Sequence, residues 1–296
     1  MVIPSFLHKG AQVALAATAR KVSSAELRPA IDLLTSWGLD VHLSSTLYCE
    51  SHQFAGTDDE RCRGLQQLLD NPEIRAIFCV RGGYGTIRFI DHLDFYLFKK
   101  YPKWVCGFSD VTALHLHLHR MAVCSIHSTI PVLFSTSSQA SLETLQKLLF
   151  GEQVTVLAPV YHLNRSGKQS GQVIGGNLSL LVNSIGTSSD SSWEGKILVI
   201  EDVDEYLYHI DRMMNQLKRS GKLTNLAGLV VGQFTDMKDN TIAFGKTAYE
   251  IIADAVSEYT YPVGYHFPIG HSTDNQAFVC GKKMTLSVDQ EGASFS

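Results

Sequence analysis

The stretch QVALAATARKVSSAELRPAIDLLTSWGLDVHLS, residues 12–44, decides the fold class. It opens with the apolar run QVALAA and closes with DVHLS, and short runs of this kind are typical of strands. Between them, Ser23 and Glu26 have the spacing of a helix capping box, and Gly38 marks a helix end. A strand, a helix and a second strand in this order predict a parallel βαβ unit.

The same alternation continues along the first half of the chain. Thr57 and Glu60 form a second capping box at the start of TDDERCRGLQQLLDNP, and AIFCV, VCGF and VCSIH read as further buried strands. The sequence therefore predicts an α/β protein with a doubly wound, mostly parallel, flavodoxin-like sheet. In such sheets, ligands bind beyond the carboxyl ends of the strands.

A change of composition after Phe134 indicates a second domain. We predict an N-terminal domain over residues 1–134 and a connecting region over residues 135–171, which contains small polar stretches and the helical segment LETLQKLLFG. A smaller C-terminal α/β domain is expected over residues 172–296. It contains the apolar strand KILVIED and the helix YLYHIDRMMNQLKRSG.

Composition excludes several classes of function. The 296 residues are 45% hydrophobic and carry a formal net charge of −4, which gives no general attraction to nucleic acid or anionic membranes. None of the six cysteines falls in a CxxC pair, so we expect a reducing compartment without a disulfide framework. The N-terminus lacks a signal-peptide pattern, and no apolar run is long enough for a membrane span, so we expect a cytoplasmic protein.

The turn GFSD, residues 107–110, is the first candidate for chemistry. Ser109 would stand at the carboxyl end of a strand, next to helix-start amides that stabilise the negative charge developed in acyl transfer. The nucleophile pattern G-x-S-x-G is incomplete, because Val111 stands where the second glycine belongs. A plain helix cap made by Ser109 or Asp110 explains the local sequence as well.

A glycine-rich loop follows another strand in CVRGGYGTIRFI, residues 79–90. Gly82, Gly83 and Gly85 allow a close approach of backbone to a ligand, and an oxyanion-binding amide is one possibility here. The dinucleotide fingerprint fails, because Arg88 occupies the third glycine position, and there is no P-loop lysine. A tight turn without a ligand is the alternative.

Two residues of the second half could complete a catalytic set. Glu201 ends the apolar strand KILVIED, the position from which α/β sites are built, whereas Asp204 and Glu205 read as a solvated helix start. His271 lies in the loop FPIGHSTDNQAF and could act as a general base, although a surface-loop histidine is the commoner explanation. A serine nucleophile needs such a base, and the base needs an acid that holds its tautomer.

The histidines of HLHLHR offer a competing metal site. His115 and His119 share one face of a helix, as metal ligands would. No HExxH glutamate accompanies them, so ordinary helix histidines are the favoured interpretation.

Five stretches together resemble the LD-carboxypeptidase family, which includes muramoyltetrapeptide carboxypeptidase and the microcin C immunity peptidases. They occur in family order over most of the chain: FAGTDDERCRGLQQLLDNPEIRAIFCVRGGYGTIRFIDHLDF, PKWVCGFSDVTALHLHLH, GQVIGGNLSLLVNSIGT, KILVIEDVDEYLYHIDRMMNQLKRSG and FPIGHSTDNQAFVCGKKMTL. The combination is far more specific than any one stretch.

The resemblance implies a serine peptidase without a metal ion or other cofactor. Ser109 matches the nucleophile, Glu201 and His271 match the other triad members, and the amides of Gly83 and Asp110 match the oxyanion hole. The expected reaction cleaves an L,D peptide bond and releases the terminal D-alanine of murein tetrapeptide in cytoplasmic wall recycling. Family members often form a homodimer, with the site between an N-terminal and a C-terminal domain.

Three points stay open at this stage. Many family members carry His-Gly-Pro where this chain has His127-Ser128-Thr129, in a segment expected near the substrate. Arg81 is a candidate for binding the terminal carboxylate, with structural pairing as an equal alternative. The alternative functions are a related peptidase acting on a peptide–nucleotide conjugate and a non-catalytic module that binds a small ligand.

Overall fold

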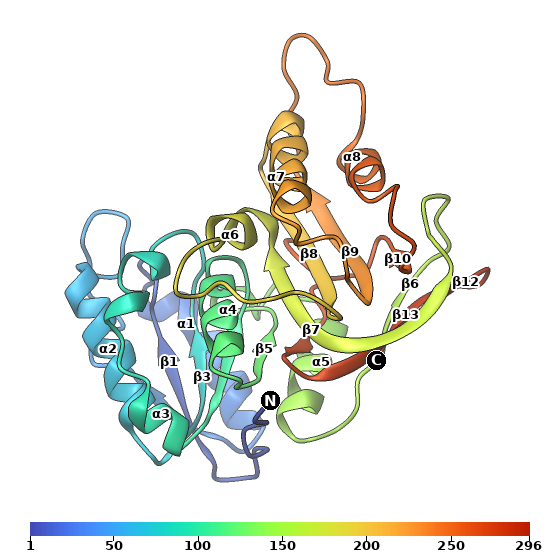
Figure 1. The fold of residues 1–296 in the computed structure, drawn as a ribbon. Helices are drawn as coiled ribbons and strands as arrows, with labels where there is room; N and C mark the ends of the chain where they lie inside the picture. Colours follow the sequence, from blue (N-terminus) through green and yellow to red (C-terminus); the bar gives the residue numbers. More distant parts are fainter.

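The chain folds into two sheets with helices around them, as the computed structural model of all residues 1–296 shows (Figure 1). The first sheet has six strands in the order β11-β5-β4-β3-β1-β2. Its strands are β1 (Gln12–Ala16), β2 (Asp40–Leu43), β3 (Ile74–Cys79), β4 (Trp104–Gly107), β5 (Ser125–His127) and β11 (Phe278–Cys280). Strands β1 to β5 are parallel in the flavodoxin-like order 2-1-3-4-5, which confirms the predicted fold class.

Alternate residues of β1 pack on opposite faces of this sheet. Val13 and Leu15 belong to one hydrophobic cluster, while Ala14 and Ala16 belong to another. Because both faces are covered, the strands read as continuous apolar runs rather than as alternating ones. The helices that belong to this half are α1 (Ser24–Ser36), α2 (Asp58–Asp70), α3 (Tyr96–Lys100) and α4 (Thr112–Arg120).

Both predicted capping boxes are present. The Ser23 hydroxyl accepts a hydrogen bond from the Glu26 amide and the Glu26 carboxylate accepts one from the Ser23 amide, so α1 begins at Ser24. Thr57 and Glu60 do the same at the start of α2. These local hydrogen bonds satisfy orphan amides of the first helical turn, which is why the helix starts can be read from the sequence.

The second sheet has seven strands in the order β10-β9-β8-β7-β12-β13-β6. They are β6 (Val156–Ala158), β7 (Gly167–Asn177), β8 (Ile197–Val203), β9 (Gly228–Thr235), β10 (Val263–Gly264), β12 (Lys283–Asp289) and β13 (Gly292–Phe295). The helices of this half are α6 (Leu178–Asn183), α7 (Leu207–Arg219) and α8 (Ala248–Ala255). Short 3₁₀ turns complete the chain at η1 (Thr86–Arg88), η2 (Ile90–His92), η3 (Ser109–Val111) and η4 (Pro131–Leu133).

Strand β7 holds the two parts of this mixed sheet together. Its first half pairs antiparallel with β12, and its last residues, Val173–Asn177, pair parallel with β8. The strand begins at Gly167, inside the small polar residues that the sequence assigns to a connecting region, together with α5 (Gln139–Leu149) and β6. Pairing with β12, more than 100 residues later, orders this polar segment, and a local pattern does not show it.

Strand β11 connects the two halves. It is hydrogen-bonded antiparallel to β5 in the first sheet, although it lies more than 150 residues later in the chain. Val279 belongs to the core cluster of the first sheet, whereas Phe278 and Cys280 belong to the core of the second. The predicted domain boundaries at residues 134 and 171 stay predictions, and this late strand crosses between the halves.

Two further features bear on the expectations from composition. All six cysteines are free thiols, and Cys79, Cys106, Cys124 and Cys280 are buried. None of the helices combines the length and the apolar character that crossing a bilayer requires.

The α1 capping box gives a stability prediction. Ser23→Ala removes the cap of an exposed helix start and should lower the free energy of unfolding by about 1 kcal/mol. Ser36→Ala, at the other end of the same helix, removes only a hydroxyl bonded to the Leu33 carbonyl and should change it by less than about 0.5 kcal/mol. Urea denaturation of both variants measures the difference, and equal effects would contradict the capping role.

Candidate active site

A sharp turn between β4 and α4 presents Ser109. The residue has φ of +62°, a left-handed conformation that costs a non-glycine residue roughly 1 to 2 kcal/mol. Gly107 precedes it with φ of +152°, and the 3₁₀ turn η3 leads directly into α4. The side chain is half-buried at the carboxyl end of a strand, and a strained serine at this position resembles the nucleophile elbow of serine hydrolases.

The glycine-rich loop after β3 lies against this turn. A Cβ atom on Gly82 would come within 3.0 Å of Ser109 Oγ and 3.8 Å of the Asp110 amide nitrogen. Glycine is therefore required at position 82 for the close approach. The neighbouring Gly83 is exposed, has φ of +106°, and donates no hydrogen bond from its amide within the chain. The two residues predicted to supply oxyanion-binding amides, Gly83 and Asp110, thus belong to segments in contact.

The buried carboxylate of Asp110 holds this loop in place. It accepts hydrogen bonds from the amides of Gly85, at 3.2 Å, and Thr86, at 3.0 Å. Burial raises the pKa of Asp110, and the hydrogen bonds from Thr86 and Gly85 oppose that rise. The sequence suggested a helix cap for this residue, but the structure uses its side chain to fix the loop of the adjacent strand.

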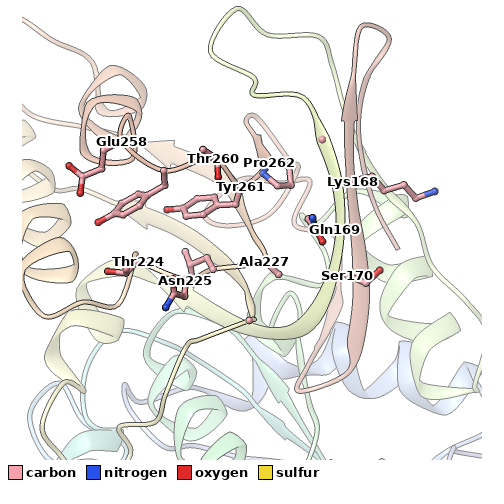
Figure 2. Close-up of a pocket in the computed structure, with 14 residues that line it drawn as sticks. Lys168, Gln169, Ser170, Thr224, Asn225, Ala227, Glu258, Thr260, Tyr261 and Pro262 are labelled. Carbon is pink, nitrogen blue, oxygen red and sulfur yellow. The ribbon is translucent and has the colours of Figure 1, made fainter.

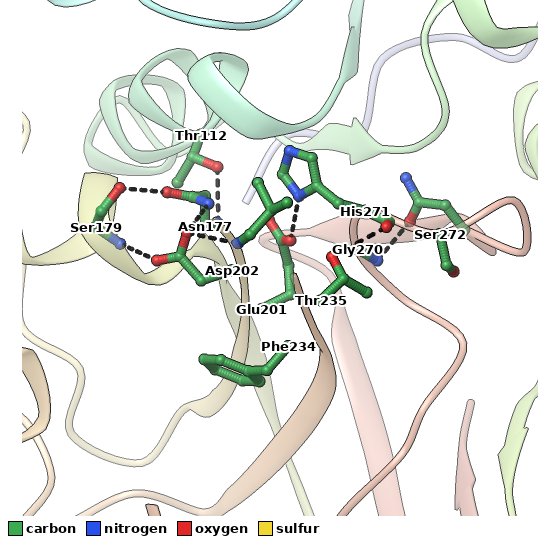
Figure 3. A network of polar contacts seen from close by, with 12 residues as sticks. Thr112, Asn177, Ser179, Glu201, Asp202, Phe234, Thr235, Gly270, His271 and Ser272 are labelled. Atoms are coloured by element: carbon green, nitrogen blue, oxygen red, sulfur yellow. Dashed lines mark hydrogen bonds and ion pairs between the residues drawn. The ribbon is translucent and has the colours of Figure 1, made fainter. Parts of the chain in front are cut away.

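Glu201 and His271 form a close pair in the second half of the chain. Glu201 Oε2 lies 2.7 Å from His271 Nδ1, and the Glu201 side chain is fully buried (Figure 3). His271 is the only hydrogen-bond partner of this carboxylate, because the other oxygen, Oε1, has none. The second ring nitrogen of His271 faces away from Glu201 (Figure 3). This arrangement fixes the tautomer with the proton on Nδ1 and leaves Nε2 as an acceptor.

A β-bulge presents Glu201. The pairing of β8 with β9 shifts register between Ile200 and Asp202, so Glu201 lies at the irregularity, and its side chain is buried. A bulge of this kind re-aims a side chain next to a functional site. Gly270, with φ of +123°, allows the His271 loop to approach, since a Cβ there would come within 2.9 Å of Glu201 Oε2.

Contacts with α5 hold the His271 loop. Ser138, the N-cap of α5, donates to Asp274 Oδ1 at 2.8 Å, and the Asn275 amide donates to Ser141 Oγ at 2.7 Å. On the other side, the His271 ring lies 4.7 Å from the ring of Phe108, the residue before Ser109. Phe108 therefore brings the two halves of the site together. The structure has no hydrogen bond between Ser109 and His271, and apo sites often tighten such bonds only when substrate is bound.

The pKa of His271 is raised above its ordinary value by its partners. Burial alone lowers it, but the charge and hydrogen bond of Glu201 outweigh burial, and Asp202 adds to the effect. Burial, followed by the neighbouring Glu201 charge, raises the pKa of Asp202 to about 7.

A network centred on Asn177 connects the two halves beside this pair (Figure 3). The backbone amide of Asn177 donates a hydrogen bond to Thr112 Oγ1, in the first turn of α4, at 3.0 Å. Its side chain donates to Asp202 Oδ1 at 2.8 Å and accepts from Ser179 and Leu180. Thr112 follows Ser109 by three residues and Asp202 follows Glu201 directly, so this network sets the distance between the two parts of the site.

The remaining histidines have structural environments. His115 is buried, and its ring nitrogens lie 2.8 Å from Ser125 Oγ and 2.9 Å from the Gly107 carbonyl. Burial lowers its pKa to about 4. His117 contacts Ser189, and His119 is buried as well. No group of three or more potential metal ligands occurs in the structure, and the hydrogen bonds of His115 go to Ser125 and the Gly107 carbonyl.

The segment that departs from His-Gly-Pro is buried. His127 stacks on Phe278 with ring centroids 4.6 Å apart, and neither ring nitrogen has a polar partner. Burial holds the pKa of His127 well below its ordinary value. Ser128 and Thr129 are likewise buried, with Thr129 bonded to Ser137. Arg81, the other open candidate, is paired with Glu26 at 2.7 Å and also bonds the Lys21 carbonyl.

A large cavity lies elsewhere in the structure. It has about 740 Å³ and is lined by polar residues such as Lys168, Asn225 and Glu258, with Tyr259 and Tyr261 (Figure 2). Gly195 and Ala227 place it at the amino ends of β8 and β9, whereas Glu201 lies at the carboxyl end of β8. None of the predicted site residues lines it. This cavity and the Glu201–His271 pair therefore lie at opposite ends of β8.

Comparison with known proteins identifies two matching family models. The N-terminal domain model of LD-carboxypeptidases matches residues 13–128, and the C-terminal domain model matches residues 170–286. A probable murein peptide carboxypeptidase of Bacillus subtilis (strain 168) is 34% identical over 299 residues, covering 98% of this chain and 93% of the relative.

Solved structures with the same fold are also found. The crystal structure of muramoyltetrapeptide carboxypeptidase from Oxalobacter formigenes has a TM-score of 0.88 at 26% identity, covering 96% of this chain and 97% of that one. The microcin C7 self immunity protein in complex with aspartyl sulfamoyl adenosine has a TM-score of 0.87 at 18% identity, covering 100% of this chain and 98% of that one. The second likeness shows a shared fold only.

The Asn177 network gives a prediction about the junction of the halves. Thr112→Val leaves the buried Asn177 amide without an acceptor and should lower the free energy of unfolding by about 1 to 3 kcal/mol. Thr112→Ser keeps the hydroxyl and is the matched control, expected to lose less. Denaturant unfolding measures both, and a Val variant as stable as the Ser variant would show that the bond is not needed.

A second prediction concerns the protonation of His271. In the unchanged protein, its ring should titrate above the ordinary histidine value, since Glu201 favours the charged form. Glu201→Gln removes that charge and leaves the burial, so the pKa of His271 should fall. Nuclear magnetic resonance titration of the ring, assigned with His271→Asn, measures the change, and an unchanged pKa would contradict the coupling.

Proposed function

Because this chain belongs to the LD-carboxypeptidase family, we propose that it is a serine carboxypeptidase that releases the terminal D-alanine of murein tetrapeptide. The bond cleaved is an L,D peptide bond, from the L-centre of diaminopimelate or lysine to D-alanine. The observation that carries the proposal is the buried Glu201–His271 pair, in contact with the turn that presents Ser109. The names of the relatives support the substrate.

Ser109 is the proposed nucleophile. His271 Nε2 takes the hydroxyl proton as Ser109 Oγ attacks the peptide carbonyl, and Glu201 stabilises the imidazolium that forms. The strained backbone at Ser109 holds the hydroxyl out of the helix that follows. The raised pKa of His271 favours this proton uptake.

Two backbone amides are proposed to bind the oxyanion. Gly83 supports this role because its amide has no acceptor within the chain, and the Asp110 amide comes from the segment packed on the same loop. Asp110 itself fixes the loop through Gly85 and Thr86. Loss of a single oxyanion donor costs about 2.7 to 4 kcal/mol of transition-state stabilisation in other serine hydrolases.

The leaving group and water complete the reaction. The imidazolium of His271 gives its proton to the amine of D-alanine as the carbon–nitrogen bond breaks, and an acyl ester on Ser109 remains. His271 then deprotonates a water molecule that attacks the ester. As the ester bond breaks and the tripeptide acid leaves, His271 gives that proton to Ser109 Oγ. Side chains and amides of this chain supply every step, so the mechanism requires neither a metal ion nor another cofactor.

We propose a cytoplasmic homodimer as the working form. Six cysteines without a CxxC pair, all present as free thiols, suit a reducing compartment. The net charge of −4 gives no general attraction to nucleic acid or to an anionic membrane surface. The homodimer follows from the family resemblance.

Ser109→Ala tests the mechanism. The variant should lose D-alanine release from murein tetrapeptide by a factor of roughly 10³ to 10⁶, because no other hydroxyl can form the acyl ester. Mass spectrometry of the peptide products measures the release. Ser45→Ala is the matched control, since Ser45 is a surface residue bonded only to Gln67.

Three arms of the same assay separate the alternatives. A Ser109→Ala variant with full D-alanine release would refute the mechanism. For a variant that loses release, a circular dichroism spectrum shows whether it is still folded. A chelator should leave the rate of D-alanine release unchanged. Loss of release in the presence of a chelator would support a metal site. A peptide–nucleotide conjugate offered in parallel should be cleaved far more slowly than the tetrapeptide; the opposite preference would support the alternative substrate.

A further inference from the structure

Arg20 lies at the carboxyl end of β1, and its side chain covers the glycine loop. A Cβ atom on Gly83 would come within 2.7 Å of Arg20 Nε and 2.8 Å of its Cγ and Cδ. Only the absence of a side chain at position 83 allows the arginine to lie there. Arg20 is exposed, and an antiparallel bridge to Phe54 fixes its backbone.

Arg20 is the cation of this region that has no partner. Lys21 is paired with Glu50, and Arg81 is paired with Glu26, both at 2.7 Å. Arg20 makes no ion pair and no side-chain hydrogen bond in the structure. The Arg20 guanidinium is exposed and unpaired, and its side chain lies against Gly83. It is therefore available for an anionic ligand, and its planar fork of N–H donors matches a carboxylate.

The topology places Arg20 where ligands bind. In the order 2-1-3-4-5, chain connections leave in opposite directions from β1 and β3, and ligands bind in the crevice at that switch point. Arg20 follows β1, Gly82 and Gly83 follow β3, and Ser109 follows β4. These three adjacent strands therefore place the guanidinium, the glycine loop and the serine in one row.

The separation of Arg20 and Ser109 suits a short leaving group. The Arg20 side chain lies over Gly83, and the neighbouring Gly82 lies against Ser109. The carbonyl under attack and the carboxylate at the far end of one terminal residue lie roughly 4 Å apart through three backbone bonds. A single terminal residue therefore has its carbonyl at Ser109 and its carboxylate on the side of Arg20.

We propose that Arg20 binds the terminal carboxylate of the substrate, with the leaving D-residue lying between Ser109 and the Arg20 side chain that covers Gly83. This assignment rests on the proposed carboxypeptidase function and deepens it. A carboxylate one residue beyond the bond at Ser109 fits this row, so Arg20 restricts cleavage to the last residue of a peptide. Arg81 has no such role, because Glu26 occupies its guanidinium.

The test compares two substrates that differ only at the terminus: the tetrapeptide acid and its C-terminal D-alaninamide. The wild-type enzyme should prefer the acid. Arg20→Gln should lower kcat/KM for the acid by about 10- to 100-fold, chiefly through KM, and leave the amide within about twofold. Arg20→Lys should recover part of the preference, because it keeps the charge without the fork.

Two matched controls accompany the variant. Arg28→Gln removes an exposed arginine paired with Asp32 on α1, and Arg81→Gln removes the paired neighbour. Both should keep the preference for the acid. An Arg20→Gln variant that keeps it too, or that loses acid and amide equally, overturns the assignment of Arg20 while the proposed function stands. A wild-type enzyme that releases nothing from either peptide overturns the proposed function and this assignment together.

Discussion

One buried hydrogen bond sets the geometry on which the site depends, that from the Asn177 amide to the Thr112 hydroxyl. Thr112 is the first residue of α4, the helix that follows Ser109. Asn177 is the last residue of β7 and lies directly opposite Glu201 of β8 in the sheet. The two halves therefore meet beside the site. The approach is close, because a Cβ on Gly176 would lie 2.5 Å from Thr112 Oγ1. A shift of this junction would move the serine relative to the Glu201–His271 pair.

Three buried carboxyl groups near this junction have different uses. Asp110 accepts hydrogen bonds from two backbone amides and so fixes the glycine loop. Asp202 accepts hydrogen bonds from Asn177 and Ser179. Glu201 is hydrogen-bonded only to His271. Burial raises the pKa of Asp110 and Asp202, the latter to about 7. Buried carboxylates are expensive unless they are hydrogen-bonded. Here the hydrogen bonds that offset the free-energy cost of burial also hold neighbouring segments of the site in position.

Local signals explain what could be read from the sequence. Ser23 and Thr57 mark helix starts because a capping box lies within four residues, and apolar runs such as QVALAA mark strands buried on both faces. Glu201 can be identified from the sequence because it closes the apolar run of KILVIED. Strand β11 and the first half of β7 could not be read in the same way, because their partners are far away in the chain. His115 and His119 share one helix face, as metal ligands would, but His115 is buried and its ring is hydrogen-bonded to the Gly107 carbonyl.

The sequence by itself determined the alternation of strands and helices, the capped helix starts and the family to which the chain is similar. These follow from hydrogen bonds and apolar patterns within short segments, or from motifs kept in order. Only the tertiary structure decided which polar groups meet. It paired Glu201 with His271 across 70 residues and Arg81 with Glu26, and it left Arg20 unpaired over Gly83. Contacts of this kind depend on sheet order and on how closely backbones approach, and neither can be read from a local pattern.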